Sequence, residues 1–152
     1  MLIKSFGAPD AAENFVGYLN DLLQILDETS TGWIYWSYDK GGDFSILDSK
    51  GNEKGNLSPL IRTYPQKVAG WIQEFSYDPE SRRFELTFRK KKNASGATEI
   101  FVPVSRVYGG SFQVTSTDPF GTWSHVFDPS RKVLSIYADP GSDSHTIVIT
   151  PQ

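Results

Sequence analysis

The chain has 152 residues, of which 38% are hydrophobic and 14% aromatic, and its formal net charge is -3. This balance excludes a disordered chain and argues against a nucleic-acid-binding protein. There is no cysteine, which excludes disulfides, thiol catalysis and cysteine-based zinc sites. No stretch approaches the roughly 20 apolar residues of a membrane-spanning helix.

The first 39 residues predict a strand, a helix and a second strand. A short apolar stretch at residues 2–6 ends at the turn Gly7-Ala8-Pro9. Apolar residues then recur at helical spacing, at Phe15, Leu19, Leu22, Leu23 and Leu26. Asp10 and Glu13 have the spacing of an N-terminal capping box for this helix. Because the return is short, we expect the two strands to be parallel, as in barrels and doubly wound sheets.

The second of these strands is unusually aromatic. Residues 32–39 read Gly-Trp-Ile-Tyr-Trp-Ser-Tyr-Asp, and a polar, glycine-rich turn follows. Alternation along a strand places Ile34, Trp36 and Tyr38 on one face and Trp33, Tyr35 and Ser37 on the other. Flat rings beside a carboxylate suit a sugar-binding site, so Trp36, Tyr38 and Asp39 are candidate substrate contacts. The alternative is a buried aromatic strand, since aromatic residues are good strand formers.

From Trp71 onward the sequence predicts strands and turns alone. Seven short strands are expected at residues 71–77, 83–89, 98–104, 111–116, 122–127, 133–138 and 145–150. Four Asp-Pro turns separate strands, at Asp78, Asp118, Asp128 and Asp139. Short strands at this regular spacing predict an antiparallel β-sandwich.

Several smaller motifs leave alternatives open. The basic run from Arg89 to Lys92 predicts either a solvated hairpin tip or a contact with an anionic membrane surface. Asp139, Asp143 and His145 could hold calcium, but a polar turn is the favoured explanation, and we expect no metal or other cofactor. Two glycosylation sequons, beginning at Asn56 and Asn93, are short patterns that often arise by chance.

Four passages resemble one known family. Residues 3–7 (Ile-Lys-Ser-Phe-Gly), 17–21 (Gly-Tyr-Leu-Asn-Asp), 32–39 and 60–70 are similar to the endoglycoceramidases and related enzymes of glycoside hydrolase family 5. The resemblance implies a mainly β chain: the last strand-helix-strand part of a (β/α)8 barrel at residues 1–69, followed by a C-terminal antiparallel β-sandwich at residues 70–152. It also implies a parent that cleaves the glycan-ceramide bond of glycosphingolipids with retention, and Trp36 as the tryptophan that floors the subsite next to that bond.

Two departures from the family pattern decide what this chain can do. Such a barrel takes about 250 residues, so only roughly two of its eight strand-helix units are expected here, and the family's acid/base has no counterpart. Ser5 falls where the family has its catalytic glutamate nucleophile. Retaining hydrolysis needs two carboxyl groups about 5 Å apart, and a serine without a positioned base is a poor nucleophile. We therefore expect the isolated chain to be inactive.

The sequence favours one function and leaves two alternatives. The favoured interpretation is the C-terminal part of an endoglycoceramidase-like hydrolase, whose glycolipid or oligosaccharide partner binds through a complete barrel. The first alternative is a stand-alone β-sandwich module that binds carbohydrate or lipid, and the second is an unrelated β-rich structural protein. We also expect the chain to self-associate through open barrel edges.

Overall fold

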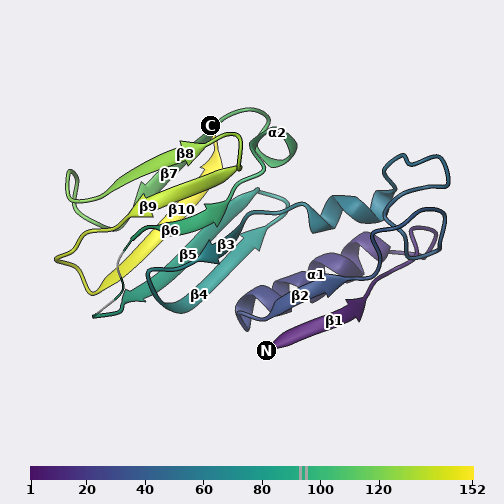
Figure 1. The fold of residues 1–152 in the computed structure, drawn as a ribbon, viewed down its shortest axis with the longest axis horizontal. Coiled ribbons are helices and arrows are strands. Elements are labelled where there is room, and N and C mark those ends of the chain that lie inside the picture. The colour runs from purple at the N-terminus through teal and green to yellow at the C-terminus, as the bar shows by residue number, and fades with distance from the viewer. Residues whose placement is uncertain (93, 95) are drawn as a thin grey trace. The chain divides into compact units, whose positions relative to one another are not determined.

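The computed structural model describes residues 1–92, 94 and 96–152, and the chain divides into two compact units, Met1–Ile61 and Arg62–Gln152 (Figure 1). The first unit contains β1 (Leu2–Phe6), α1 (Phe15–Glu28), β2 (Gly32–Tyr35) and the 3-10 helix η1 (Gly55–Leu60). Strands β1 and β2 pair in parallel, from Leu2 opposite Gly32 to Phe6 opposite Tyr35. This confirms the expected parallel pair and its helical crossover.

The expected capping box is wrong. Helix α1 begins at Phe15, and the residue before it, Asn14, has a left-handed backbone with no side-chain cap. Asp10 is instead ion-paired with Lys54, with 3.0 Å between Oδ1 and Nζ. The apolar face of the helix is as predicted, since Leu19, Leu23 and Leu26 are buried. In the described part of the chain, no helix is long and apolar enough to cross a membrane.

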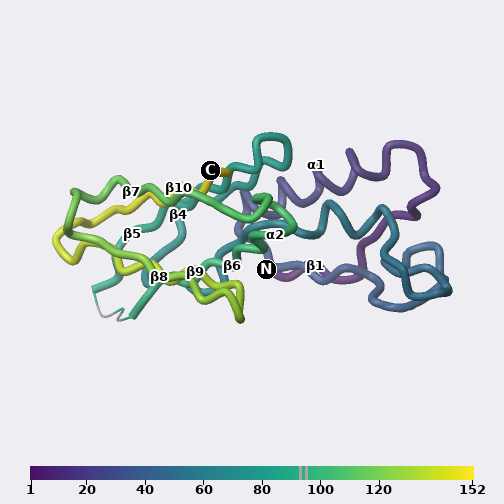
Figure 2. The backbone as a smooth tube through the Cα atoms, turned by 90° about the horizontal axis from the view of Figure 1, so that it is seen from above, coloured from purple at the N-terminus to yellow at the C-terminus, as the bar shows by residue number. Residues whose placement is uncertain are grey.

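The second unit is built from two four-stranded sheets, with strand orders β4-β5-β10-β7 and β3-β6-β9-β8 (Figures 1 and 2). All strand pairs within both sheets are antiparallel. The elements are β3 (Tyr64–Lys67), β4 (Gly70–Asp78), β5 (Arg83–Lys90), β6 (Thr98–Phe101), α2 (Val104–Val107), β7 (Phe112–Ser116), β8 (Ser124–Asp128), β9 (Val133–Tyr137) and β10 (Ser144–Pro151). The predicted mainly β fold with an antiparallel sandwich is confirmed.

Alternating side chains form the core of the sandwich. On β5, Phe84, Leu86 and Phe88 are buried, whereas the residues between them are partly exposed. Ile147 and Ile149 of the neighbouring β10 are also fully buried. Burying apolar side chains of this size stabilises each by about 1.5–3 kcal/mol relative to exposure, so this inward-facing set holds the sheets together.

The seven predicted strands all occur, with two differences. The strand expected at residues 98–104 ends at Phe101, because the chain turns there and forms the short helix α2. An eighth strand, β3, was not predicted, and it pairs with β6. The two compact units meet between Ile61 and Arg62, and the domain bounds expected from sequence, residues 1–69 and 70–152, stay a prediction.

Three of the four Asp-Pro turns have the expected chemistry. The carboxylates of Asp78, Asp128 and Asp139 each accept a hydrogen bond from the backbone amide two residues ahead, at 2.9 Å. Asp118 differs, because its buried carboxylate is hydrogen-bonded to Nδ1 of His145 at 2.7 Å. The sequon Asn93-Ala94-Ser95 lies outside the described residues.

Candidate functional site

The site predicted from sequence lies at the C-terminal ends of β1 and β2. Beyond the last residue of β2, the amide of Trp36 donates a hydrogen bond to the carbonyl oxygen of Phe6 at 2.8 Å. Ser5 lies beside this bond, where the pairing of β1 shifts register between Lys4 and Phe6. Its backbone is left-handed, with φ 66°, and its side chain is exposed. A non-glycine residue in this region is uncommon and concentrates at functional sites.

The aromatic residues of this segment divide between two faces as predicted. Ile34, Trp36 and Tyr38 are 53%, 62% and 82% exposed. Trp33 and Tyr35 are half-buried, and both contact the ring of Phe6 edge-on, at centroid distances of 5.9 and 5.6 Å. Trp36 and Tyr38 are therefore free to contact a ligand, while Trp33 and Tyr35 pack. The peptide bond between Trp36 and Ser37 is cis.

Asp39 is held as a carboxylate by two serine hydroxyls. Ser45 and Ser37 both donate to Oδ1, the latter at 2.7 Å. The hydrogen bond from Ser45, then that from Ser37, and finally the charge of Lys54 hold the pKa of Asp39 below its usual value, against a small opposing effect of desolvation. An exposed, ionised carboxylate can accept hydrogen bonds from sugar hydroxyls. Its low pKa makes it unsuited to act as a general acid.

Buried polar side chains that sequence reasoning missed fix the loop behind this site. The side-chain nitrogen of Asn56 contacts the Tyr35 hydroxyl, the Ala8 carbonyl and the Ser45 carbonyl at 3.0, 3.3 and 3.1 Å. Asn56 is fully buried, so its sequon is a structural feature and not an exposed glycosylation site. Lys54 completes the support by contacting the carbonyls of Gly42 and Asp43. The sequence carries no pattern that would have identified these contacts.

The two histidines and the possible calcium site of the second unit are accounted for by local packing and hydrogen bonds. His145 is paired with Asp118, and the ring of His125 stacks on Trp123 at 5.5 Å, so both histidines are engaged within the second unit. Within the described residues, no group of three His, Cys, Asp or Glu side chains could hold a metal. The calcium cluster at Asp139, Asp143 and His145 is therefore not formed. The carboxylate of Asp139 instead binds its own turn, at Gly141 and Ser142.

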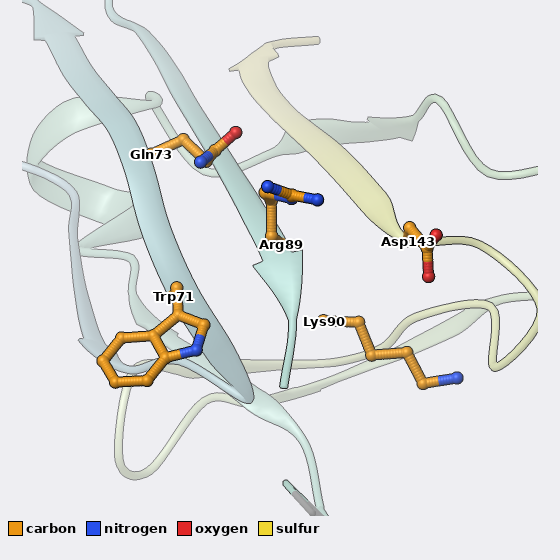
Figure 3. A pocket seen from close by; sticks show the side chains of 5 residues that line it. All are labelled: Trp71, Gln73, Arg89, Lys90 and Asp143. Atoms are coloured by element: carbon orange, nitrogen blue, oxygen red, sulfur yellow. The ribbon is translucent and has the colours of Figure 1, made fainter. Parts of the chain in front are cut away.

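The second unit has a surface pocket of about 370 Å³ lined by Trp71, Gln73, Arg89, Lys90 and Asp143. Figure 3 shows Arg89 on β5 between Gln73 and Trp71 of β4 on one side and Asp143 on the other. Trp71 is 63% exposed, and the ammonium of Lys91 lies 4.8 Å from its ring centroid. An exposed indole beside charged groups is a second place where a polar ligand could bind.

The second unit matches a known protein family, and nearly the whole chain is similar to known proteins. Residues 62–149 match the glycoside hydrolase family 5 C-terminal domain. Endoglycoceramidase I of Rhodococcus hoagii (strain 103S) is 30% identical over 156 residues, covering 97% of this chain and 27% of that protein.

Two solved structures share the fold. Endo-glycoceramidase II from Rhodococcus sp. in complex with a five-membered iminocyclitol has a TM-score of 0.84 at 24% identity, over 99% of this chain and 33% of that chain. The same enzyme in complex with ganglioside GM3 has a TM-score of 0.83 at 25% identity, over 99% and 32%. This chain thus spans a third or less of the length of these relatives. It belongs to glycoside hydrolase family 5, as the C-terminal domain of an endoglycoceramidase-like protein.

Proposed function

We propose that this chain is the C-terminal part of a retaining glycoside hydrolase that cleaves the glycan-ceramide bond of glycosphingolipids, and that the isolated chain is inactive. The arrangement of Ser5 beside the Phe6 to Trp36 hydrogen bond carries the proposal. In this arrangement Ser5, at the family's nucleophile position, lies beside Trp36, the first residue of the candidate sugar platform (Trp36, Tyr38 and Asp39). Both lie at the strand ends where barrel enzymes keep their sites.

The proposed inactivity follows from the chemistry that Ser5 supplies. A retaining glycosidase attacks the anomeric carbon with a carboxylate, while a second carboxyl protonates the leaving oxygen. The Ser5 hydroxyl has no hydrogen-bonded base among the described residues, so nothing removes its proton.

The substrate contacts we propose are Trp36, Tyr38 and Asp39. The exposed rings offer flat faces for the C–H surface of a pyranose, and Asp39 can accept hydrogen bonds from its hydroxyls. The ganglioside GM3 complex of endo-glycoceramidase II supports a glycolipid as the substrate class.

The test is to restore the nucleophile. Joined to the barrel of a related endoglycoceramidase, the chain carrying Ser5→Glu should hydrolyse a glycosphingolipid, whereas the unaltered chain and a Ser5→Gln control should not. In the isolated chain Ser5→Glu should remain inactive, because one carboxylate cannot both attack and protonate. Release of sugar from an activated glycoside by the unaltered isolated chain would contradict this role of Ser5.

The pocket at Trp71 favours a second candidate function, a stand-alone carbohydrate- or lipid-binding module. Calorimetric titration of soluble oligosaccharides separates the two functions. If the chain binds sugar and Trp71→Ala abolishes binding while Trp36→Ala does not, the module interpretation holds. The reverse pattern supports the site at Trp36, just beyond β2.

A further inference from the structure

Three connections lie together at one end of the second unit: those between β5 and β6, β7 and β8, and β9 and β10 (Figures 1 and 2). The amide of Lys90 donates to the carbonyl of Asp143 at 2.9 Å, which joins the first connection to the third. The amide of Asp139 donates to Oδ2 of Asp118 at 3.0 Å, which joins the third to the second. The buried pair of Asp118 and His145 anchors this network in the core. Each of the three connections crosses from one sheet to the other, so we call this surface the crossover end.

A bare aromatic side chain projects from the crossover end. Phe120 is fully exposed, at 104% of its reference area. It occupies the second position of a four-residue turn, in which the amide of Thr122 donates to the carbonyl of Pro119 at 3.1 Å. Gly121 at the third position has φ 86°, a conformation that favours glycine. The turn therefore presents Phe120 to solvent, although packing in the sandwich does not require a phenylalanine there.

Basic residues accompany this aromatic side chain, at an end that also carries the carboxylates of Asp118, Asp139 and Asp143. The second unit contains eleven Lys and Arg against nine Asp and Glu, a net charge of +2, whereas the first unit has four against nine, a net charge of -5. Four of those eleven are consecutive, from Arg89 to Lys92, at the start of the connection between β5 and β6. Lys91 lies over the exposed ring of Trp71, and the ammonium of Lys90 donates to the carbonyl of Pro140.

We propose that the crossover end docks onto an anionic lipid bilayer, with Phe120 in the interface and Lys91 and Lys92 against the headgroups. Burial of an aromatic ring and attraction of basic residues to acidic lipids are the two contributions that hold peripheral proteins on membranes. The hydrogen-bonded network of the three connections keeps both elements in place. This contact does not depend on the proposed glycosidase function, since it uses residues of the second unit alone.

Vesicle co-sedimentation tests the proposal with the full chain and two kinds of vesicle: phosphatidylcholine alone, and phosphatidylcholine containing phosphatidylserine. The chain should bind the anionic vesicles and lose binding as salt is raised. Phe120→Ala should weaken this binding about tenfold, because a partly buried ring is removed. Lys91→Ala with Lys92→Ala should weaken it about thirtyfold, at about fivefold per lysine near the surface.

Matched variants keep the result interpretable. Val126→Ala removes an apolar side chain that is 61% exposed in the middle of β8, and Lys50→Ala removes an exposed charge from the first unit. Both should bind as the unaltered chain does, and Phe120→Trp should retain binding with its indole emission shifted to the blue. Equal binding by all variants would overturn the proposal. Displacement of the chain from vesicles by a soluble acidic oligosaccharide would also overturn it, in favour of a sugar site at Arg89.

Discussion

The hydrogen bond from the Trp36 amide to the Phe6 carbonyl, at 2.8 Å, extends the parallel pairing of β1 and β2 beyond the end of β2. It places the backbone of the candidate sugar platform beside the chain that carries Ser5. Gly7 makes this approach feasible, because a Cβ at that position would lie 2.5 Å from the carbonyl oxygen of Trp36. The site therefore depends on backbone geometry as much as on its side chains.

A Gly7→Ala substitution should destabilise the first unit. The added methyl would overlap a backbone oxygen that cannot rotate away, and we expect a loss of about 2 kcal/mol in the free energy of unfolding. Gly32→Ala is the control, because its Cβ would lie 3.3 Å from the flexible side chain of Leu2. Urea denaturation followed by tryptophan fluorescence measures both, and equal stabilities of the two variants would contradict the proposed close approach.

A second prediction concerns the pKa of Asp39, which the Ser45 and Ser37 hydroxyls hold below 3.8. Ser45→Ala removes the larger of these contributions, so the pKa should rise toward its usual value. The pKa of Asp39 is lower in the folded chain than in the unfolded chain. The carboxylate therefore stabilises the loop fully when the pH is above the unfolded-state pKa. This stabilisation is lost as the pH falls through the folded-state pKa. An NMR titration of the Asp39 side chain measures the shift. An unchanged titration midpoint in Ser45→Ala would show that the serine does not hold the carboxylate.

A third prediction concerns Tyr108, whose hydroxyl is hydrogen-bonded to that of Thr63 at 2.8 Å in the core of the second unit. Burial raises its pKa, and the hydrogen bond with Thr63 offsets part of that increase. The folded state therefore favours the protonated phenol. The contribution of the protonated phenol to the free energy of unfolding is complete below the pKa of about 10 that tyrosine has in the unfolded chain. This contribution falls as the pH rises further.

Tyr108→Phe should lower the free energy of unfolding by about 1–2 kcal/mol near neutral pH, because the buried Thr63 hydroxyl loses its hydrogen-bond partner. It should also make the alkaline loss of stability less steep. Denaturation at pH 7 and at pH 11 measures both effects. The control is Tyr137→Phe, since Tyr137 is 50% exposed, and it should leave the neutral-pH stability unchanged. A Tyr108→Phe variant as stable as the unaltered chain would contradict the third prediction.

Much of the fold could be predicted because its signals are local. The alternation around Leu86 predicts β5, and the helical spacing of Leu19 and Leu23 predicts α1. Each pattern can be recognised within a single short segment of the sequence. Strand β3 was missed because the stretch Tyr-Pro-Gln-Lys has no alternating apolar pattern, and only its distant partner β6 makes it a strand. The outward face of Trp36 could be predicted from alternation. The buried role of Asn56 could not, because three contacts from separate segments create it.

The fourth prediction is self-association. Among the described residues, β1 and β2 pair only with each other, so each leaves an edge without a partner. Leu2, Ile34 and Trp36 add exposed apolar surface beside these edges. We expect the isolated chain to elute from gel filtration as oligomers and to bind an apolar dye. Fusion to the missing barrel strands should remove both effects, and a dye-free monomer of the isolated chain would contradict the proposed barrel origin of the first unit.

The last prediction separates the two tryptophans of the aromatic segment. Trp36 is 62% exposed, whereas Trp33 is half-buried against Phe6. In the fusion in which the missing strands complete the barrel and Ser5→Glu is present, Trp36→Ala should reduce kcat/KM for a glycosphingolipid more than tenfold, by loss of ring stacking, with little change in Tm. Trp33→Ala should instead lower Tm, since replacing a core aromatic by alanine costs about 3–5 kcal/mol when burial is complete and less here. If Trp36→Ala unfolds the protein while Trp33→Ala leaves the fold intact and abolishes turnover, then the two faces have been assigned the wrong way round.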